Sequence, residues 1–146
     1  MLKRFNRAVA FLLFVLCLAS VAVAAEPAAA RASDYLDSYR AFMDADGGGK
    51  VSIWFDVCGT GMMDKVGALT VQLQESKDGG ATFTTIKTFS YLNYSNMMKR
   101  NAVSCISSVS YQGVAGRYYQ AYVTVYAAKG SGSDSRTILA SKIKAT

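Results

Sequence analysis

The carboxylates have the widest catalytic range of any side chains here, because histidine is absent from the whole sequence. Without histidine there is no Ser-His-Asp or Cys-His arrangement and no histidine-ligated metal site. Two carboxylates could still cleave a glycoside. No spacing singles out a pair, so a hydrolase is the minor alternative, and we expect no enzyme, no metal and no cofactor. The candidates for such a pair are Asp34, Asp37, Asp44, Asp56, Asp64, Glu75, Asp78 and Asp134.

Two acidic, glycine-rich segments have the composition of ion-binding loops, yet both are better explained as turns. Residues 44–49 lack the further ligands of an EF-hand calcium loop, whose closing Glu is replaced by Phe55. Residues 76–83 fit the pattern Ser-x-Asp-x-Gly-x-Thr-aromatic, which resembles the Asp box of sialidase-type propellers. The motif occurs once, in a chain too short for a propeller. We predict a hairpin turn in which Asp78 accepts amide protons.

Tyrosine is the residue type best suited to binding in this sequence, which has nine tyrosines and one tryptophan. Its ring is rigid and apolar with one polar tip, which suits binding surfaces and platforms for sugars. Two groups are candidate ligand-binding residues, one in a predicted strand and one in an irregular segment. Half-buried packing stays open for the first, and a loop folded over the core for the second. The candidates are Tyr118, Tyr122 and Tyr126 in the strand, and Tyr91 and Tyr94, beside Met97 and Met98, in the irregular segment.

Cys58 and Cys105 are the two cysteines that lie beyond the N-terminal leader-like segment, residues 1–25. In an oxidising compartment they permit one pairing only. A bridge would close a loop of about 48 residues and stabilise the fold by roughly 4 kcal/mol. We expect this disulfide, with two buried free thiols as the alternative. Trp54 is then either a semi-exposed ring or a cover over the disulfide region.

Alternation with a period of two is the dominant pattern and predicts half-buried strands. In residues 50–58 four apolar side chains from Val51 to Val57 share one side. In residues 117–128 the positions Tyr119, Ala121, Val123 and Val125 oppose the three tyrosines. Turn signals separate seven such segments, namely residues 35–45, 50–58, 69–76, 82–89, 102–111, 117–128 and 136–141.

Seven strands without an amphipathic helix predict an all-β domain over residues 34–146, a seven-stranded antiparallel β-sandwich of immunoglobulin-like or fibronectin-like type. In that topology the second and fifth strands lie side by side, which brings Cys58 and Cys105 within reach of each other. Tyr118 or Tyr119, at the start of the sixth strand, is placed to form a tyrosine corner.

Residues 1–25 have the composition of a secretory signal peptide: a basic start, an apolar run and a small-residue end. We expect cleavage after Ala24 or Ala25, a linker over residues 26–33, and a secreted, extracellular product that meets the membrane only through its leader. Three of the 16 basic residues lie in the leader and all 10 acidic residues follow it, which leaves a net charge of +3. That mild balance argues against nucleic-acid binding.

The chain resembles a family of small secreted proteins of unknown function from Gram-positive, gut-type bacteria. The resemblance lies in residues 50–57 (KVSIWFDV), 59–68 (GTGMMDKVGA), 76–83 and 116–127 (GRYYQAYVTVYA). It covers most of the chain after the leader. It implies secretion, and it implies no activity, ligand or catalytic residue.

These observations favour a secreted, non-catalytic binding or interaction module whose partner is an unknown extracellular protein or glycan. A carbohydrate-binding module that uses the surface tyrosines is the narrower alternative. A hydrolase with an Asp/Glu pair is the third. Open sheet edges would also permit assembly with another chain, and the oligomeric state stays open.

Overall fold

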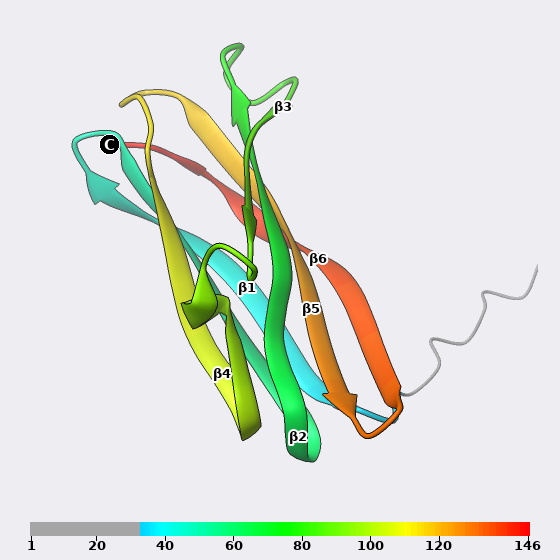
Figure 1. The fold of residues 1–146 in the computed structure, drawn as a ribbon. Helices are drawn as coiled ribbons and strands as arrows, with labels where there is room; N and C mark the ends of the chain where they lie inside the picture. Colours follow the sequence, from blue (N-terminus) through cyan, green and yellow to red (C-terminus); the bar gives the residue numbers. More distant parts are fainter. Residues whose placement is uncertain (1–32) are drawn as a thin grey trace, which may run out of the picture. The chain divides into compact units, whose positions relative to one another are not determined.

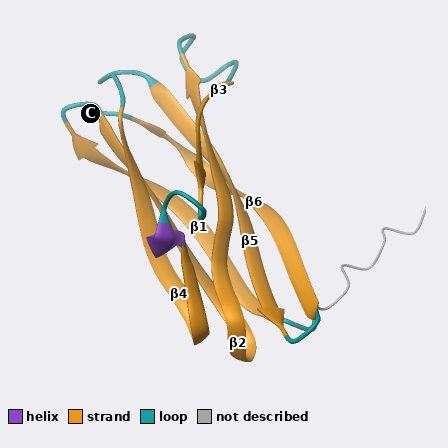
Figure 2. Cartoon of the chain, viewed as in Figure 1, coloured by secondary structure: helices purple, strands orange, loops and turns teal. Residues whose placement is uncertain are grey.

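The fold is that of a computed structural model, which describes residues 33–146. The expected leader, residues 1–25, and all of the expected linker except Ser33 lie outside the described residues. Strands make up most of the described chain, and one 3-10 turn is the helical element shown in Figure 2. The elements are β1 (Leu36–Gly47), β2 (Lys50–Ser76), β3 (Thr84–Ser90), η1 (Ser95–Met97), β4 (Met98–Gln112), β5 (Tyr118–Lys129) and β6 (Gly132–Lys144).

The long strand β2 is the spine of a single antiparallel sheet (Figure 1). Its first half pairs with β1 on one side and β4 on the other. Its second half pairs with β5 and β3, and β6 pairs with β5. The sheet curls into a half-barrel. We call β1, β4 and the first half of β2 the first wing, and β3, β5, β6 and the second half of β2 the second wing.

The all-β class and the antiparallel pairing are confirmed, whereas the seven-stranded immunoglobulin-like sandwich is not. The structure has six strands because the second and third predicted segments are one strand, β2. The stretch that we expected to connect them keeps both neighbours: Lys65 lies opposite Arg100 of β4 and opposite Ala128 of β5. Its glycines look like a break in the sequence, but Gly67 provides a bend. It has φ +152°, and a Cβ there would collide with the carbonyl oxygen of Met97.

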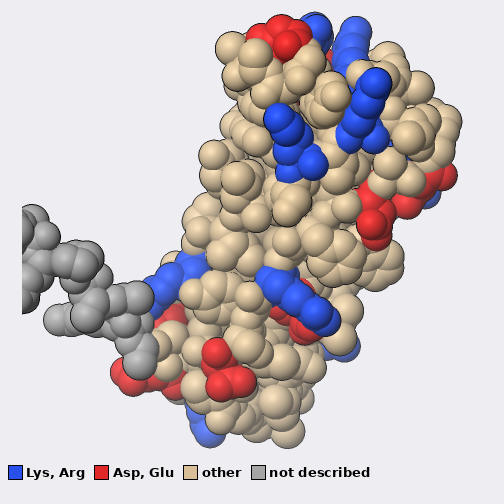
Figure 3. All heavy atoms as spheres, turned by 180° about the vertical axis from the view of Figure 1, so that it is seen from behind, with Lys and Arg blue, Asp and Glu red and all other residues tan. Residues whose placement is uncertain are grey.

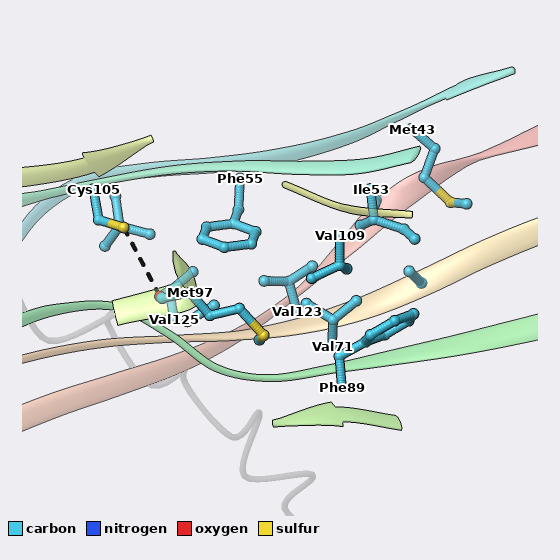
Figure 4. Packing of buried hydrophobic residues seen from close by; sticks show 14 of the residues in the cluster. Met43, Ile53, Phe55, Val71, Phe89, Met97, Cys105, Val109, Val123 and Val125 are labelled. Carbon is cyan, nitrogen blue, oxygen red and sulfur yellow. Dashed lines mark hydrogen bonds between the residues drawn. The ribbon is translucent and has the colours of Figure 1, made fainter. Parts of the chain in front are cut away.

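The core fills the space between the two wings. Figure 4 shows Phe55 and Ile53 from one wing facing Val71 and Val123 from the other. The expected inward rows Val51–Val57 and Tyr119–Val125 are confirmed, since every member is fully buried, and each Val, Ile or Phe among them stabilises the fold by about 1.5–3 kcal/mol. The third expected row is shifted by an irregularity between Ala68 and Thr70, which leaves Leu69 half-buried. The fully buried members are Val51, Ile53, Phe55, Val57, Val71, Leu73, Tyr119, Ala121, Val123 and Val125.

The expected Cys58–Cys105 disulfide is wrong, since both cysteines are free thiols. The two strands are neighbours as expected, but Cys105 lies opposite Val57, and Cys58 lies opposite Ser104. Because side chains alternate between faces, this one-residue offset sends Cys105 into the core and Cys58 to the outer face. The Cys105 thiol instead lies 3.8 Å from the carbonyl oxygen of Met97. Trp54 therefore covers no disulfide.

Strands β1 and β6, the ends of the sheet path, approach each other and are fastened at two places. At one end a single oxygen of Asp134 accepts hydrogen bonds from the Ser33 hydroxyl (2.5 Å), the Asp34 amide (3.0 Å) and the Tyr35 amide (3.2 Å). At the other end the amide of Gly49 donates to the carbonyl oxygen of Thr146 over 2.7 Å. The hydrogen bonds that Asp134 accepts lower its pKa, and the bond from the Ser33 hydroxyl contributes most.

Candidate functional site

The outer surface of β5 carries the first group of candidate tyrosines. Tyr118, Tyr122 and Tyr126 point away from the core, and each is partly exposed. Tyr122 lies between Gln72 of β2 and Leu139 of β6. We call this surface the tyrosine face; besides the three tyrosines it comprises Gln72, Gln74, Gln120, Thr124, Thr137 and Leu139.

Hydrogen bonds hold the polar side chains of the tyrosine face in place. The Gln120 amide donates to Oε1 of Gln74 over 2.8 Å, and the Gln74 amide donates to the Thr85 hydroxyl over 3.2 Å. The hydroxyls of Thr124 and Thr137 lie 3.1 Å apart. Around Tyr122 the face presents neutral donors and acceptors between aromatic rings, whereas Lys144 lies opposite Tyr118.

Two lysines border one end of the tyrosine face. The ammonium groups of Lys142 and Lys144 lie 5.7 and 5.9 Å from the ring centroid of Tyr118, within cation–π range. On the face shown in Figure 3, lysines and arginines form small separate groups, several of them beside acidic side chains.

The second group of candidate tyrosines lies elsewhere. Tyr91 and Tyr94 pack against the hydrophobic core, and the Tyr94 ring meets Phe89 edge-on with centroids 5.1 Å apart. The next segment, η1, buries Met97 completely. This arrangement is the loop folded over the core that we kept as the structural alternative. The structure thus does not bring Tyr91 and Tyr94 together with the three tyrosines of β5.

A hollow of about 270 Å³ at the end of β2 contains two of the candidate carboxylates, Glu75 and Asp78. Glu75 is nearly buried; its Oε2 accepts from the Tyr119 hydroxyl over 2.8 Å and its Oε1 from Arg117 over 3.0 Å. Burial alone would raise the pKa of Glu75, but these two hydrogen bonds and the guanidinium charge outweigh it and lower the pKa overall. The Tyr119 hydroxyl in turn accepts from the Val114 amide over 2.9 Å, so of the two candidates for a tyrosine corner it is Tyr119 whose hydroxyl bonds back to the preceding backbone.

Asp78 organises the predicted turn. Its Oδ1 accepts from the Ser76 hydroxyl over 2.6 Å and from the amides of Ala81 and Thr82 over 3.1 and 2.9 Å. These bonds, first of all that from Ser76, hold the pKa of Asp78 far below its usual range. A carboxylate pair that cleaves glycosides needs one member with a raised pKa to act as the acid. Glu75 and Asp78 both have lowered pKa values, so this hollow does not suit that chemistry.

An aromatic pair that the sequence analysis missed lies on the outer face of the first wing. Phe42 of β1 lies opposite Trp54 of β2, and the two rings are parallel within 9° with centroids 6.3 Å apart. Trp54 is thus a semi-exposed ring, as one alternative had it. The glycine turn between β1 and β2 sets which residues of the first hairpin lie opposite each other. That register was the signal in the sequence that could have predicted the pair.

Within the described residues, three or more cysteine, aspartate and glutamate side chains nowhere gather into a set able to hold a metal ion. Residues 33–146 also contain no helix with the length and apolar character needed to cross a membrane. The sequence matches no protein-family model, no curated protein and no solved structure. A function for this chain is therefore inferred from its own geometry.

Proposed function

We propose that this protein is an exported, non-catalytic binding module that holds an extended saccharide chain on its tyrosine face. The observation that carries the proposal is the row Tyr118, Tyr122 and Tyr126, which presents rings on a face of neutral glutamine and threonine side chains. Export rests on the predicted leader and on the resemblance to a family of small secreted proteins.

The spacing of the row favours a chain of sugars over a single ring. Successive tyrosines are four residues apart in one strand, which corresponds to about 13 Å at about 3.3 Å per residue. A polymer that follows β5 can stack a sugar on each ring, because the apolar faces of sugar rings pack on aromatic planes. The fixed amides of Gln74 and Gln120 lie between Tyr118 and Tyr122 and can pair with hydroxyl groups.

The neutral side chains around Tyr122 suit a ligand rich in hydroxyl groups. Amides and hydroxyls exchange water for sugar hydroxyls at small net cost. A protein partner is the competing occupant. A stable protein interface buries about 800 Å² of surface per side and has an apolar centre. Leu139 is the one strongly exposed aliphatic residue of this face, so the face offers little of that apolar centre.

A glycan array probed with the folded chain tests the proposal, followed by calorimetric titration of the best oligosaccharide. We expect Tyr122→Ala to weaken binding at least tenfold, which is about 1.4 kcal/mol. Tyr122→Phe, which keeps the ring, should retain most of the affinity. Val103→Ala is the control, because Val103 is an exposed aliphatic residue of β4, outside the face. A blank array, or full affinity in Tyr122→Ala, would overturn the proposal.

A further inference from the structure

The outer face of the first wing contains a second group of exposed side chains, separate from the tyrosine face. Trp54 and Phe42 are 37% and 41% exposed, and Asp56 follows two residues after Trp54 on the same face of β2. Arg40 of β1 lies opposite Asp56. We call these four residues the tryptophan site. It lies where β2 pairs with β1 and β4, whereas β5 joins β2 only from Lys65 onward.

The ion pair of the tryptophan site involves only one of the two Asp56 oxygens. Both Nε and Nη2 of Arg40 donate to the same oxygen of Asp56, Oδ2, over 3.2 and 3.0 Å. Oδ1 of Asp56 and Nη1 of Arg40 have no hydrogen-bond partner within residues 33–146. The pair therefore leaves one carboxylate oxygen and one guanidinium nitrogen for other partners, near two parallel rings.

A hollow of about 270 Å³ adjoins this ion pair and is lined by Ser38, Tyr39, Arg40 and Asp56. A group that enters it therefore lies beside the Arg40–Asp56 pair. Sugar hydroxyls suit both members of the pair, since a hydroxyl both donates and accepts. The same sugar chain can lay an apolar face on Trp54 or Phe42.

The exposed apolar area is too small for a stable protein partner. A fully covered aromatic ring accounts for about 150–250 Å², so two rings less than half exposed, even with neighbouring Ile106, offer roughly 250 Å². Stable complexes between proteins bury about 800 Å² on each side, of which somewhat more than half, or roughly 450 Å², is apolar. A compact, hydroxyl-rich ligand fits this small patch better.

We propose that the tryptophan site is a second saccharide-binding site, in which Trp54 and Phe42 stack the sugar and the Arg40–Asp56 pair bonds its hydroxyls. The site shares no residue with the tyrosine face, so the two proposals can be tested independently of each other. Two sites on one chain would let a polysaccharide bind at both and gain avidity without further contacts.

Trp54 is the sole tryptophan of the chain and so reports on this site alone. The experiment titrates the full chain with cellohexaose, chitohexaose and maltohexaose while tryptophan emission is recorded. At least one sugar should change the emission in a saturable way. Asp56→Ala and Phe42→Ala should each raise the apparent Kd at least fivefold. Leu92→Ala, at an exposed aliphatic residue outside both sites, is the control and should leave this titration unchanged.

Three results would overturn the inference. Emission could stay constant with all three sugars although circular dichroism shows a folded chain. The change could persist undiminished in both Asp56→Ala and Phe42→Ala. Emission without sugar could instead depend on protein concentration, which would make the site a contact between copies of the chain. Failure of the tyrosine face to bind a sugar would not by itself contradict the proposal for the tryptophan site.

Discussion

The hydroxyl of Tyr119 donates to Oε2 of Glu75 over 2.8 Å, at a point where both side chains are shielded from water. The same hydroxyl accepts from the Val114 amide. One oxygen thus connects β5, the end of β2 and the loop before β5. This contact lies on the inner side of the strand whose outer side forms the tyrosine face, and it fixes how β5 enters the sheet.

Tyr119→Phe should destabilise the fold by about 1–3 kcal/mol, because Oε2 of the nearly buried Glu75 and the Val114 amide each lose their hydrogen-bond partner, although Arg117 still pairs with Oε1. Urea unfolding measures the effect. Tyr118→Phe is the matched control: it removes the hydroxyl of the neighbouring tyrosine, which points outward and makes no hydrogen bond within the described residues. Equal stability of the two variants would contradict the role given to Tyr119.

Acid should weaken the fold through Glu75. Its pKa is lower in the folded chain than the ordinary value of 4.5, so the unfolded chain binds the proton more readily. The stabilisation is therefore complete above that ordinary value and is lost as the pH falls through the lowered folded-state value. Glu75→Gln should be less stable near neutral pH and should show a shallower loss in acid.

Asp78 and Asp134 also have lowered pKa values, so Glu75→Gln should keep part of the acid dependence. Free energies of unfolding measured from pH 7 down to about pH 2 give the slope in each protein. If the wild type and Glu75→Gln lose stability in parallel, Glu75 is not a source of the acid dependence.

Gly67 should tolerate no side chain. A Cβ there would overlap the carbonyl oxygen of Met97, and φ +152° is strained for any other residue. Gly67→Ala should cost at least about 1–3 kcal/mol of stability by thermal or urea unfolding. Gly61→Ala is the control, since it lies in the same strand with open space at its Cβ position. If Gly67→Ala is as stable as the wild type, Gly67 is not required for the bend of β2.

The two thiols should differ sharply in reactivity. Cys58 is partly exposed, whereas Cys105 is buried, and burial raises the pKa of its thiol, so less of the reactive thiolate forms. Peptide mass spectrometry after alkylation of the native chain should find Cys58 modified and Cys105 protected until denaturant is added. A peptide that joins Cys58 to Cys105 would contradict the register of β2 and β4.

Patterns local to one strand were predictable from the sequence. Alternation identified most of the inward positions of β2 and β5, and the predicted turn, in which Asp78 accepts amide protons, was confirmed. Relations between strands were not predictable. The continuity of β2 past its glycines depends on partners on both sides, and the faces of Cys58 and Cys105 depend on a one-residue register. The pairing of Phe42 with Trp54 depends on register as well.

The candidate tyrosines show the same limit. Alternation predicted that Tyr118, Tyr122 and Tyr126 lie on the side opposite Tyr119, and the structure has them there. The sequence did not distinguish Tyr91 and Tyr94 as a cover over the core, because that depends on how an irregular segment folds back onto Phe89. Saccharide binding at the row on β5 stays a prediction.

The most direct measurement of the central claim is the NMR signal of the tyrosine rings during titration with a sugar selected on the array. The ring protons of Tyr122 and Tyr126 should shift in a saturable way, while those of buried Tyr119, in the same strand, should stay in place. Unmoved rings on the outer face of β5, with a sugar that demonstrably binds the chain, would contradict the account.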